Sequence, residues 1–306
     1  LFEPHFDSGE IKRLGIEAMD ALDILPDRPG AMTWRRVNRL LFGQHPYGLS
    51  KLGTKRSLSE LTPGKLRRLH RLWAQAGNLV ISVVGSGELE RVADRVERLF
   101  SPLATFPGDG PALNSPVFKR ADQEEVLRAG RGQSHVVVAW GTRGLEDEGR
   151  LALDLASSVL GSPSGRLFQR IRDRYGLAYD LDASHAAAPL GGCFSLELST
   201  EASRSEEARD RLIQEIREVA KHGVLEDELH RAKAKLLFER QDALQLSGSR
   251  AAELAYWERC STEDAFEKVD RELSALQQVG TAEVQSAVEA LLSGTGVVCV
   301  RSLPKG

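Results

Sequence analysis

An internal repeat constrains this chain more than any other feature of its sequence. In each of the two copies, from Leu61 to Ser82 and from Val279 to Val300, the sequence predicts an amphipathic helix, a short turn and then a buried strand. A second pair of segments, each opening a helix-like stretch, aligns at the same separation and in the same order. Two matches at one separation indicate two homologous units. The aligned segments are Glu10–Arg13 with Glu228–Arg231, Leu61–Leu66 with Val279–Val284, and Leu79–Ser82 with Val297–Val300. We call the constant offset between them, from Glu10 to Glu228, the repeat separation.

The repeat also predicts where the units begin and end. The second unit starts as a strand near Gln133, so the counterpart of that strand would lie about 85 residues before Leu1. We therefore expect residues 1–104 to be the C-terminal part of a first unit that is incomplete at its N-terminus. Residues 105–132, rich in Pro and Gly near their start, are expected to be a linker. Residues 133–306 are expected to form a second, complete unit.

The order of expected elements predicts an α+β fold. Strands and helices come in runs, and consecutive strands are close enough for hairpins, which favours an antiparallel or mixed sheet packed by helices over a Rossmann alternation. Strands are expected over 78–85, 134–140, 177–186, 192–200 and 296–302. Helices are expected over 9–25, 31–43, 62–75, 87–100, 147–160, 164–175, 203–222, 226–245, 248–258, 263–275 and 281–292.

Composition excludes several functional classes. The chain has 306 residues, a net charge of -3 and 6% aromatic residues, which argues against a nucleic-acid partner. No apolar run approaches the roughly 18 residues of a membrane-spanning helix. Three widely spaced cysteines predict neither a disulfide framework nor a Cys-x-x-Cys zinc site. The chain opens on Leu1 without an initiator methionine, and the sequence does not distinguish a periplasmic from a cytoplasmic location.

Several short motifs occur in an order and spacing typical of one enzyme family. They are His45-Pro-Tyr-Gly48, Asn78-Leu-Val-Ile-Ser-Val-Val-Gly85, Gly165-Arg-Leu-Phe168, Arg172 and Tyr175-Gly-Leu-Ala-Tyr179. With these motifs the sequence resembles the insulinase/pitrilysin zinc peptidases, which include mitochondrial processing peptidase. The resemblance covers nearly the whole chain and implies tandem homologous α+β units of the processing-peptidase type.

The resemblance also implies a zinc endopeptidase whose two clam-like halves enclose a chamber. In that family the zinc is bound by a His-x-x-Glu-His motif and a third Glu downstream, and the Glu within the motif acts as base on zinc-bound water. This chain has seven histidines, none four residues apart, and no such motif. We therefore expect no cofactor in this chain, and zinc either in a partner or in an N-terminal segment upstream of Leu1.

The position of the third zinc ligand can be checked within this chain. In active members that Glu lies eight residues before a Pro, which lies sixteen residues before the His-Pro-Tyr-Gly motif. Here the Pro is Pro29, and the ligand position is then Ala21, whose methyl group cannot bind zinc. A rival register uses Glu10 and Glu17, which have the family's spacing of seven, but it needs a four-residue slip. Both registers stay open, with Ala21 preferred and Glu17 as the rival ligand.

Arg172 and Tyr179 are the candidate substrate-binding residues. The resemblance implies that a half without zinc carries an Arg and a Tyr seven residues apart, which reach across the chamber to the substrate. Arg172 and Tyr179 have that spacing. A guanidinium and a phenol are donors suited to a peptide carbonyl or to the oxyanion of a transition state. We expect Arg172 near the end of a helix, Tyr179 on the strand after Gly176, and both on one surface facing the chamber.

Three functions are compatible with these observations. The first is a non-catalytic half of an insulinase-type zinc peptidase assembly, which closes a chamber and holds an extended peptide. Its partners would be a homologous zinc-bearing subunit and the peptide substrate. The second is an active zinc metalloendopeptidase whose His-x-x-Glu-His segment lies upstream of Leu1. The third is a structural subunit without a proteolytic role.

Overall fold

The computed structural model describes residues 2–103, 113–130, 132–261 and 263–305. Its strands are β1 Gln123–Arg128, β2 Gln133–Thr142, β3 Asp180–Ala188, β4 Gly191–Glu201 and β5 Val298–Leu303. Its α-helices up to residue 161 are α1 Ser8–Ile24, α2 Pro29–Phe42, α3 Lys55–Ser59, α4 Pro63–Trp73, α5 Leu89–Phe100 and α6 Arg150–Gly161. A π-helix follows over Phe168–Arg174. The remaining helices are α7 Ser205–His222, α8 Glu226–Gln245, α9 Ser247–Cys260, α10 Ala265–Gln278 and α11 Thr281–Gly294.

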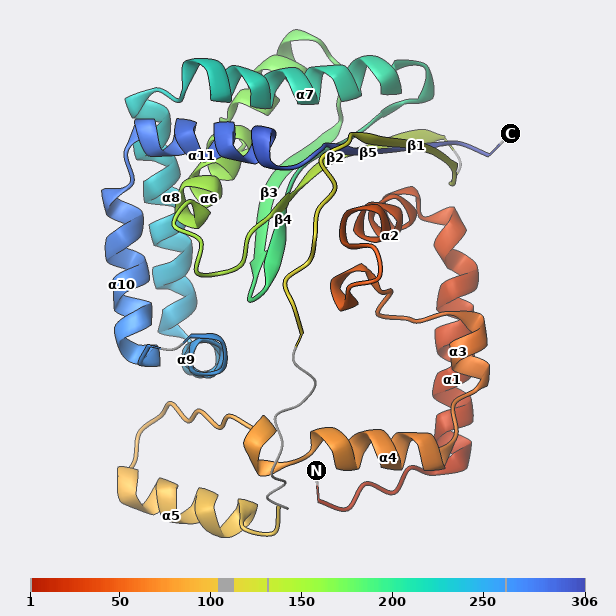
Figure 1. Ribbon diagram of the computed structural model, residues 1–306, viewed down its shortest axis with the longest axis vertical. Coiled ribbons are helices and arrows are strands. Elements are labelled where there is room, and N and C mark those ends of the chain that lie inside the picture. The colour runs from red at the N-terminus through yellow and green to blue at the C-terminus, as the bar shows by residue number, and fades with distance from the viewer. Residues whose placement is uncertain (1, 104–112, 131, 262, 306) are drawn as a thin grey trace. The chain divides into compact units, whose positions relative to one another are not determined.

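The strands form one mixed sheet in the order β1-β5-β2-β4-β3 (Figure 1). Strands β2, β4 and β3 run antiparallel to their neighbours, and β2 is also antiparallel to β5. Among the described residues, β1 and β5 form the one parallel pair. The α+β class with a mixed sheet is therefore confirmed.

Helices cover both faces of this sheet. On one face α6, α7 and α11 pack against a core that includes Val136, Val138 and Phe194, all fully buried. On the other face α2 packs over β2 and β5 (Figure 1), and Val37 and Val137 belong to one buried apolar cluster there. Alternate residues of β2 thus point to opposite faces and both sets are buried, as expected for a central strand.

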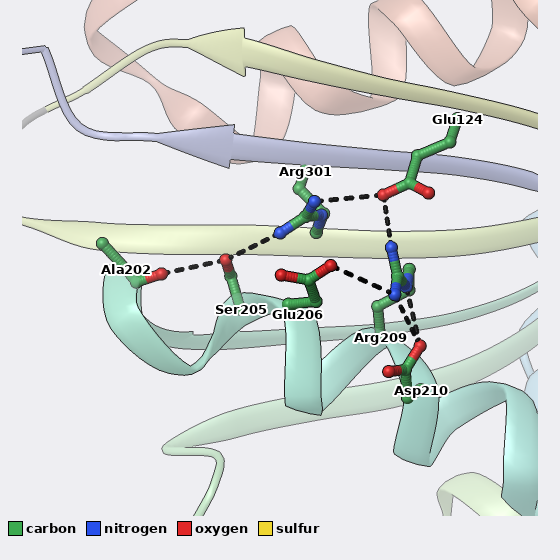
Figure 2. Close-up of polar contacts among 7 residues, drawn as sticks. All are labelled: Glu124, Ala202, Ser205, Glu206, Arg209, Asp210 and Arg301. Atoms are coloured by element: carbon green, nitrogen blue, oxygen red, sulfur yellow. Dashed lines mark hydrogen bonds and ion pairs between the residues drawn. The ribbon is translucent and has the colours of Figure 1, made fainter.

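A polar network holds the edge strand β1 (Figure 2). One carboxylate oxygen of Glu124 on β1 accepts a hydrogen bond from Arg301 on β5 at 3.1 Å and another from Arg209 on α7. Arg209 also donates to Asp210 at 2.7 Å, and Arg301 donates to the Ser205 hydroxyl at 3.3 Å. The start of α7 is therefore tied to the parallel strand pair. The sequence analysis did not predict β1, which lies within the segment 105–132.

The helices reproduce the repeat. Three pairs of helices begin one repeat separation apart: α1 at Ser8 with α8 at Glu226, α2 with α9, and α4 with α11. For α2 and α9 both ends match, at Pro29–Phe42 and Ser247–Cys260. The repeat seen in a few apolar matches therefore extends to the order and the starting positions of these helices.

The described residues group into two compact units that differ from the two sequence halves. Unit 1 takes its residues from 1–22, 52–113 and 240–272, and unit 2 takes its residues from 23–51, 114–239 and 273–306. The segment 23–51, which carries α2, thus groups with the second half, and 240–272, which carries α9, groups with the first. These two segments are counterparts in the repeat. Unit 2 therefore contains α2 of the first half of the sequence, and unit 1 contains the equivalent helix α9 of the second half. The boundaries 1–104, 105–132 and 133–306 stay a prediction about the repeat.

The strand expected over 78–85 is wrong. Residues 79–84 belong to no helix or strand, and they pair with no strand among the described residues. A strand requires a hydrogen-bonded neighbour, and apolar alternation alone does not supply one. In the described part of the chain, no helix has the length and apolar character to cross a membrane.

The cysteines allow a first prediction. Burial raises the pKa of Cys193 and of Cys299 to about 12, whereas Cys260 is only half-buried. Because the thiolate is the reactive form, we expect a thiol reagent at pH 8 to modify at most Cys260 in the native protein and all three thiols in urea. Intact mass before and after unfolding measures this, and rapid native labelling of Cys193 or Cys299 would contradict it.

Candidate functional site

The candidate residues lie after a tight turn at the end of α6. A Cβ added to Gly165 would come within 2.6 Å of the Leu160 carbonyl oxygen, so only glycine fits this turn. Arg166 follows and points inward: it donates to both carboxylate oxygens of Glu228 at 2.8 and 2.6 Å and to the Gly223 carbonyl at 3.0 Å. This bidentate pair fixes the start of the helix against the beginning of α8.

The helix after Arg166 is a π-helix rather than the expected α-helix. It carries Arg170, which donates to Glu215 of α7 at 2.9 Å. Burial raises the pKa of Glu215, and the charge and hydrogen bond of Arg170 oppose that shift without cancelling it. Ile171 is fully buried, so the inward face of the π-helix is anchored by one ion pair and one apolar contact. Segments of π-helix are rare and often occur at functional sites.

Arg172 and Tyr179 lie on either side of the turn that ends this helix. The side chain of Arg172 is exposed, with its guanidinium carbon 5.7 Å from the Phe168 ring centroid. Within the described part of the chain, no carboxylate forms an ion pair with it. Gly176 adopts a φ of 57°, as the turn requires, and Tyr179 stands 68% exposed, one residue before β3. Neither side chain is part of the buried core, and both are exposed.

The same turn carries an arginine cluster that the sequence analysis missed. Arg211 of α7 stacks 4.0 Å from the Tyr175 ring centroid, and Arg174 lies 5.5 Å from it on the π-helix. Arg204 donates to the carbonyl oxygens of Gly176 and Tyr175 at 3.0 and 3.3 Å. Arg204 ends a short 3-10 turn directly before α7, and Arg211 lies on α7. Both come some thirty residues after Tyr175, so no local sequence pattern could have placed them here.

The His-Pro-Tyr-Gly motif has a structural role. The His45 ring accepts a hydrogen bond from the Tyr47 backbone at 3.2 Å, and its other nitrogen lies 3.0 Å from the Asn114 carbonyl oxygen. The Tyr47 ring packs edge-on against Phe42, the last residue of α2. A Cβ on Gly48 would lie 2.9 Å from the Gly43 carbonyl oxygen. The motif therefore closes the end of α2, and both ring nitrogens of His45 are engaged in these backbone contacts.

The residues of α1 do not fit a zinc site. Glu17, the rival ligand, forms an ion pair with Arg13, which also binds Glu10 at 2.8 Å. The hydrogen bond and charge of Glu10, with the charge of Glu17, raise the pKa of Arg13, so a permanent cation stands between the two carboxylates. Ala21 on the same helix has no donor atom. Among the described residues no group of three His, Cys, Asp or Glu side chains could hold a metal ion.

Residues 60–236 match the model of the peptidase M16 inactive domain, more than half of the chain. The chain belongs to the peptidase M16 inactive-domain family. The matched residues include the π-helix with Arg172 and also Tyr179, and this M16 segment includes no zinc-binding motif.

Relatives and solved structures extend the comparison. An uncharacterized zinc protease of Streptomyces coelicolor is 26% identical over 82% of this chain, which spans 57% of that relative's length. The crystal structure of an M16 inactive domain from Pseudomonas fluorescens matches with a TM-score of 0.87 at 21% identity, covering 99% of this chain and 72% of that one. A protease structure from Helicobacter pylori matches with a TM-score of 0.84 at 17% identity, covering 98% and 73%. These structures confirm the fold.

Proposed function

We propose that this M16 chain is the non-catalytic half of a zinc peptidase assembly, in which it closes a chamber and helps to hold an extended peptide. The observation that carries the proposal is the exposed pair Arg172 and Tyr179, presented on a π-helix and turn that Arg166 anchors from beneath. The family match supports the non-catalytic role, and the zinc proteases among the relatives support zinc in the other half.

The architecture proposed with this function is a tandem one. Residues 1–104 would be the C-terminal part of one peptidase-like unit, 105–132 the connection and 133–306 the second unit. Zinc, bound by a homologous subunit or by a segment upstream of Leu1, would supply the activated water. This chain would contribute donors to the peptide carbonyl from Arg172 and Tyr179. Main-chain pairing of the peptide to a sheet edge would add affinity with little sequence preference.

Reconstitution tests the proposal. We expect the chain to cleave no peptide alone and to raise the kcat/KM of a homologous half that carries His-x-x-Glu-His. A zinc-bearing half with its motif Glu replaced by Gln is the control, and the mixture with it should be inactive. Binding to the zinc-bearing half without any change in turnover would support a structural subunit instead.

Zinc content is a separate prediction. Because Arg13 occupies the carboxylates of Glu10 and Glu17, and because Ala21 cannot bind a metal, the dialysed chain should retain less than one equivalent of zinc. Elemental analysis after dialysis measures this. If the chain retains one equivalent of zinc, and this zinc is lost in Glu17→Gln but kept in Glu3→Gln, then Glu17 is a zinc ligand and the rival register is correct.

A further inference from the structure

The arginine cluster holds more positive charge than the proposed roles of Arg172 and Tyr179 use. The guanidinium carbons of Arg174 and Arg211 lie 5.5 and 4.0 Å from the Tyr175 ring centroid. In the described part of the chain, no carboxylate forms an ion pair with either of them. The whole chain carries a net charge of -3, so this local excess of positive charge does not follow from a basic composition.

The acidic side chains near the cluster do not neutralise it. Glu207 lies one turn before Arg211 on α7, but its carboxylate is bound by Arg204 at 3.2 Å. Asp173 is next to Arg174 in the sequence, yet it is exposed and forms no ion pair with an arginine of the described residues. Like charges that lie close together without a counter-ion repel each other. An anion bound at the cluster would relieve that repulsion.

Arg211 leaves one edge of its guanidinium unused. Its Nη1 donates to the Tyr175 hydroxyl at 3.2 Å and to the Gln214 amide oxygen at 3.3 Å, and both acceptors are neutral. Its Nε and Nη2 donate no hydrogen bond to any described residue, and the side chain is only half-buried. These two nitrogens form an edge that can pair with a carboxylate through two parallel hydrogen bonds.

The surroundings hold this edge in place before any ligand binds. The guanidinium of Arg211 stacks on the Tyr175 ring. The turn that carries this ring is fixed by Arg204, which donates to the carbonyl oxygens of Tyr175 and Gly176 at 3.3 and 3.0 Å. Little side-chain freedom is therefore lost when a carboxylate binds, which favours affinity.

We propose that Arg211 binds a carboxylate of the peptide through Nε and Nη2, so that the assembly prefers peptides which carry one. The role of Arg211 rests on the proposed function, because Arg172 and Tyr179 on either side of the same turn would hold the neighbouring main chain. The carboxylate comes from an acidic side chain or from the C-terminus of the peptide, since both present the same two oxygens. Arg174 adds attraction through its charge without touching the ligand. The contact is made equally in the ground state and the transition state, so it acts on KM and not on kcat.

Fluorescence anisotropy of three labelled peptides tests the chain alone. The peptides share one neutral sequence. The first has a glutamate at its centre and an amidated C-terminus, the second is neutral with a free C-terminal carboxylate, and the third is neutral and amidated. We expect the third to bind about tenfold more weakly than whichever of the other two fills the site, as for a charge-assisted, bidentate contact. The comparison of the first two identifies the source of the carboxylate.

Substitutions on α7 assign this preference to Arg211. Arg211→Gln should lower the affinity for the preferred peptide by about tenfold and leave that for the neutral amidated peptide unchanged. Arg211→Lys keeps the charge but loses the fork, so it should restore only part of the affinity. Arg217→Gln is the matched control, because it removes the same charge from the same helix and Arg217 forms no ion pair among the described residues. Circular dichroism of each variant confirms folding.

Three results would overturn the proposal: equal binding of the three peptides, no binding of any of them, or a preference that persists in Arg211→Gln. An oligothymidylate that competes as strongly as the preferred peptide would overturn it in favour of a general polyanion surface. Reconstitution with the zinc-bearing half keeps the two proposals apart. A carboxylate preference without any turnover would contradict the proposed function alone, whereas turnover with the same KM for all three peptides would contradict the role of Arg211 alone.

Discussion

Replacing Arg172 by alanine should lower the kcat of the reconstituted peptidase by about a hundred- to a thousand-fold. This is the usual loss when one donor to a developing oxyanion is removed, about 2.7–4 kcal/mol. The structure leaves the guanidinium exposed and without a carboxylate partner among the described residues, so its removal should cost little folding stability. Steady-state kinetics on a peptide substrate, with circular dichroism of each variant, measures both effects.

The distribution of the loss between kcat and KM separates two roles. A donor used only in the transition state lowers kcat, whereas a hydrogen bond to a neutral carbonyl in the ground state is worth about 0.5–1.5 kcal/mol and raises mainly KM. Tyr179→Phe removes the phenolic donor but keeps the ring and should act in the same direction with a smaller loss. Arg174→Ala is the matched control, because it removes the same charge two residues away on the same helix. Equal losses of kcat in Arg172→Ala and Arg174→Ala would mean that the effect comes from removing a positive charge from this region and not from a specific hydrogen bond of Arg172.

The regular helices of this chain were predictable from the sequence, because their periodicity and end signals agree. Helix α8 has the predicted bounds of 226–245, since three acidic residues favour its first turn and the heptad-like apolar spacing continues to its end. Helix α4 begins as expected after Thr62, whose hydroxyl accepts the Lys65 backbone N–H, with Pro63 in the first turn.

The failures have physical reasons that lie outside local sequence. Strand β1 reads Gln-Glu-Glu-Val-Leu-Arg and lacks apolar alternation. It is an edge strand whose inward positions are only half-buried, and the ion pairs of Glu124 help to hold it. The segment 79–84 has the pattern of a strand but no partner among the described residues. The spacing of Arg172 and Tyr179 was recognisable, whereas the π-helical backbone and the arginines around Tyr175 depend on tertiary contacts.

The anchor beneath the candidate site gives the second large prediction. Arg166→Ala should destabilise unit 2 by about 3 kcal/mol. This is the lower end of the range observed when one member of a buried ion pair is removed. The side chains of Arg166 and Glu228 are 9% and 16% exposed, so the variant leaves a carboxylate that is poorly hydrated. Urea unfolding followed by intrinsic fluorescence measures the loss. Replacing both residues, with Arg166→Met and Glu228→Leu, should cost less than Arg166→Ala alone, because no buried charge is then left without a partner.

The pH dependence of the free energy of unfolding shows why Arg166→Ala is less stable than the wild type. Burial on its own would raise the pKa of Glu228, but hydrogen bonds from Arg166 and from the Leu225 backbone outweigh it, and the pKa is lowered. The stability that Glu228 contributes is therefore full above the unfolded value of about 4.3 and is lost as the pH falls through the lower folded value. In Arg166→Ala the burial remains and two donors are gone, so the pKa of Glu228 should rise instead. The free energy of unfolding of the variant then falls as the pH rises through this raised pKa of Glu228. The difference in the free energy of unfolding between wild type and variant is therefore smaller in acid. If the difference in the free energy of unfolding between wild type and Arg166→Ala stays constant between pH 3 and pH 7, Arg166 stabilises the protein through packing of its aliphatic carbons rather than through the charge of Glu228.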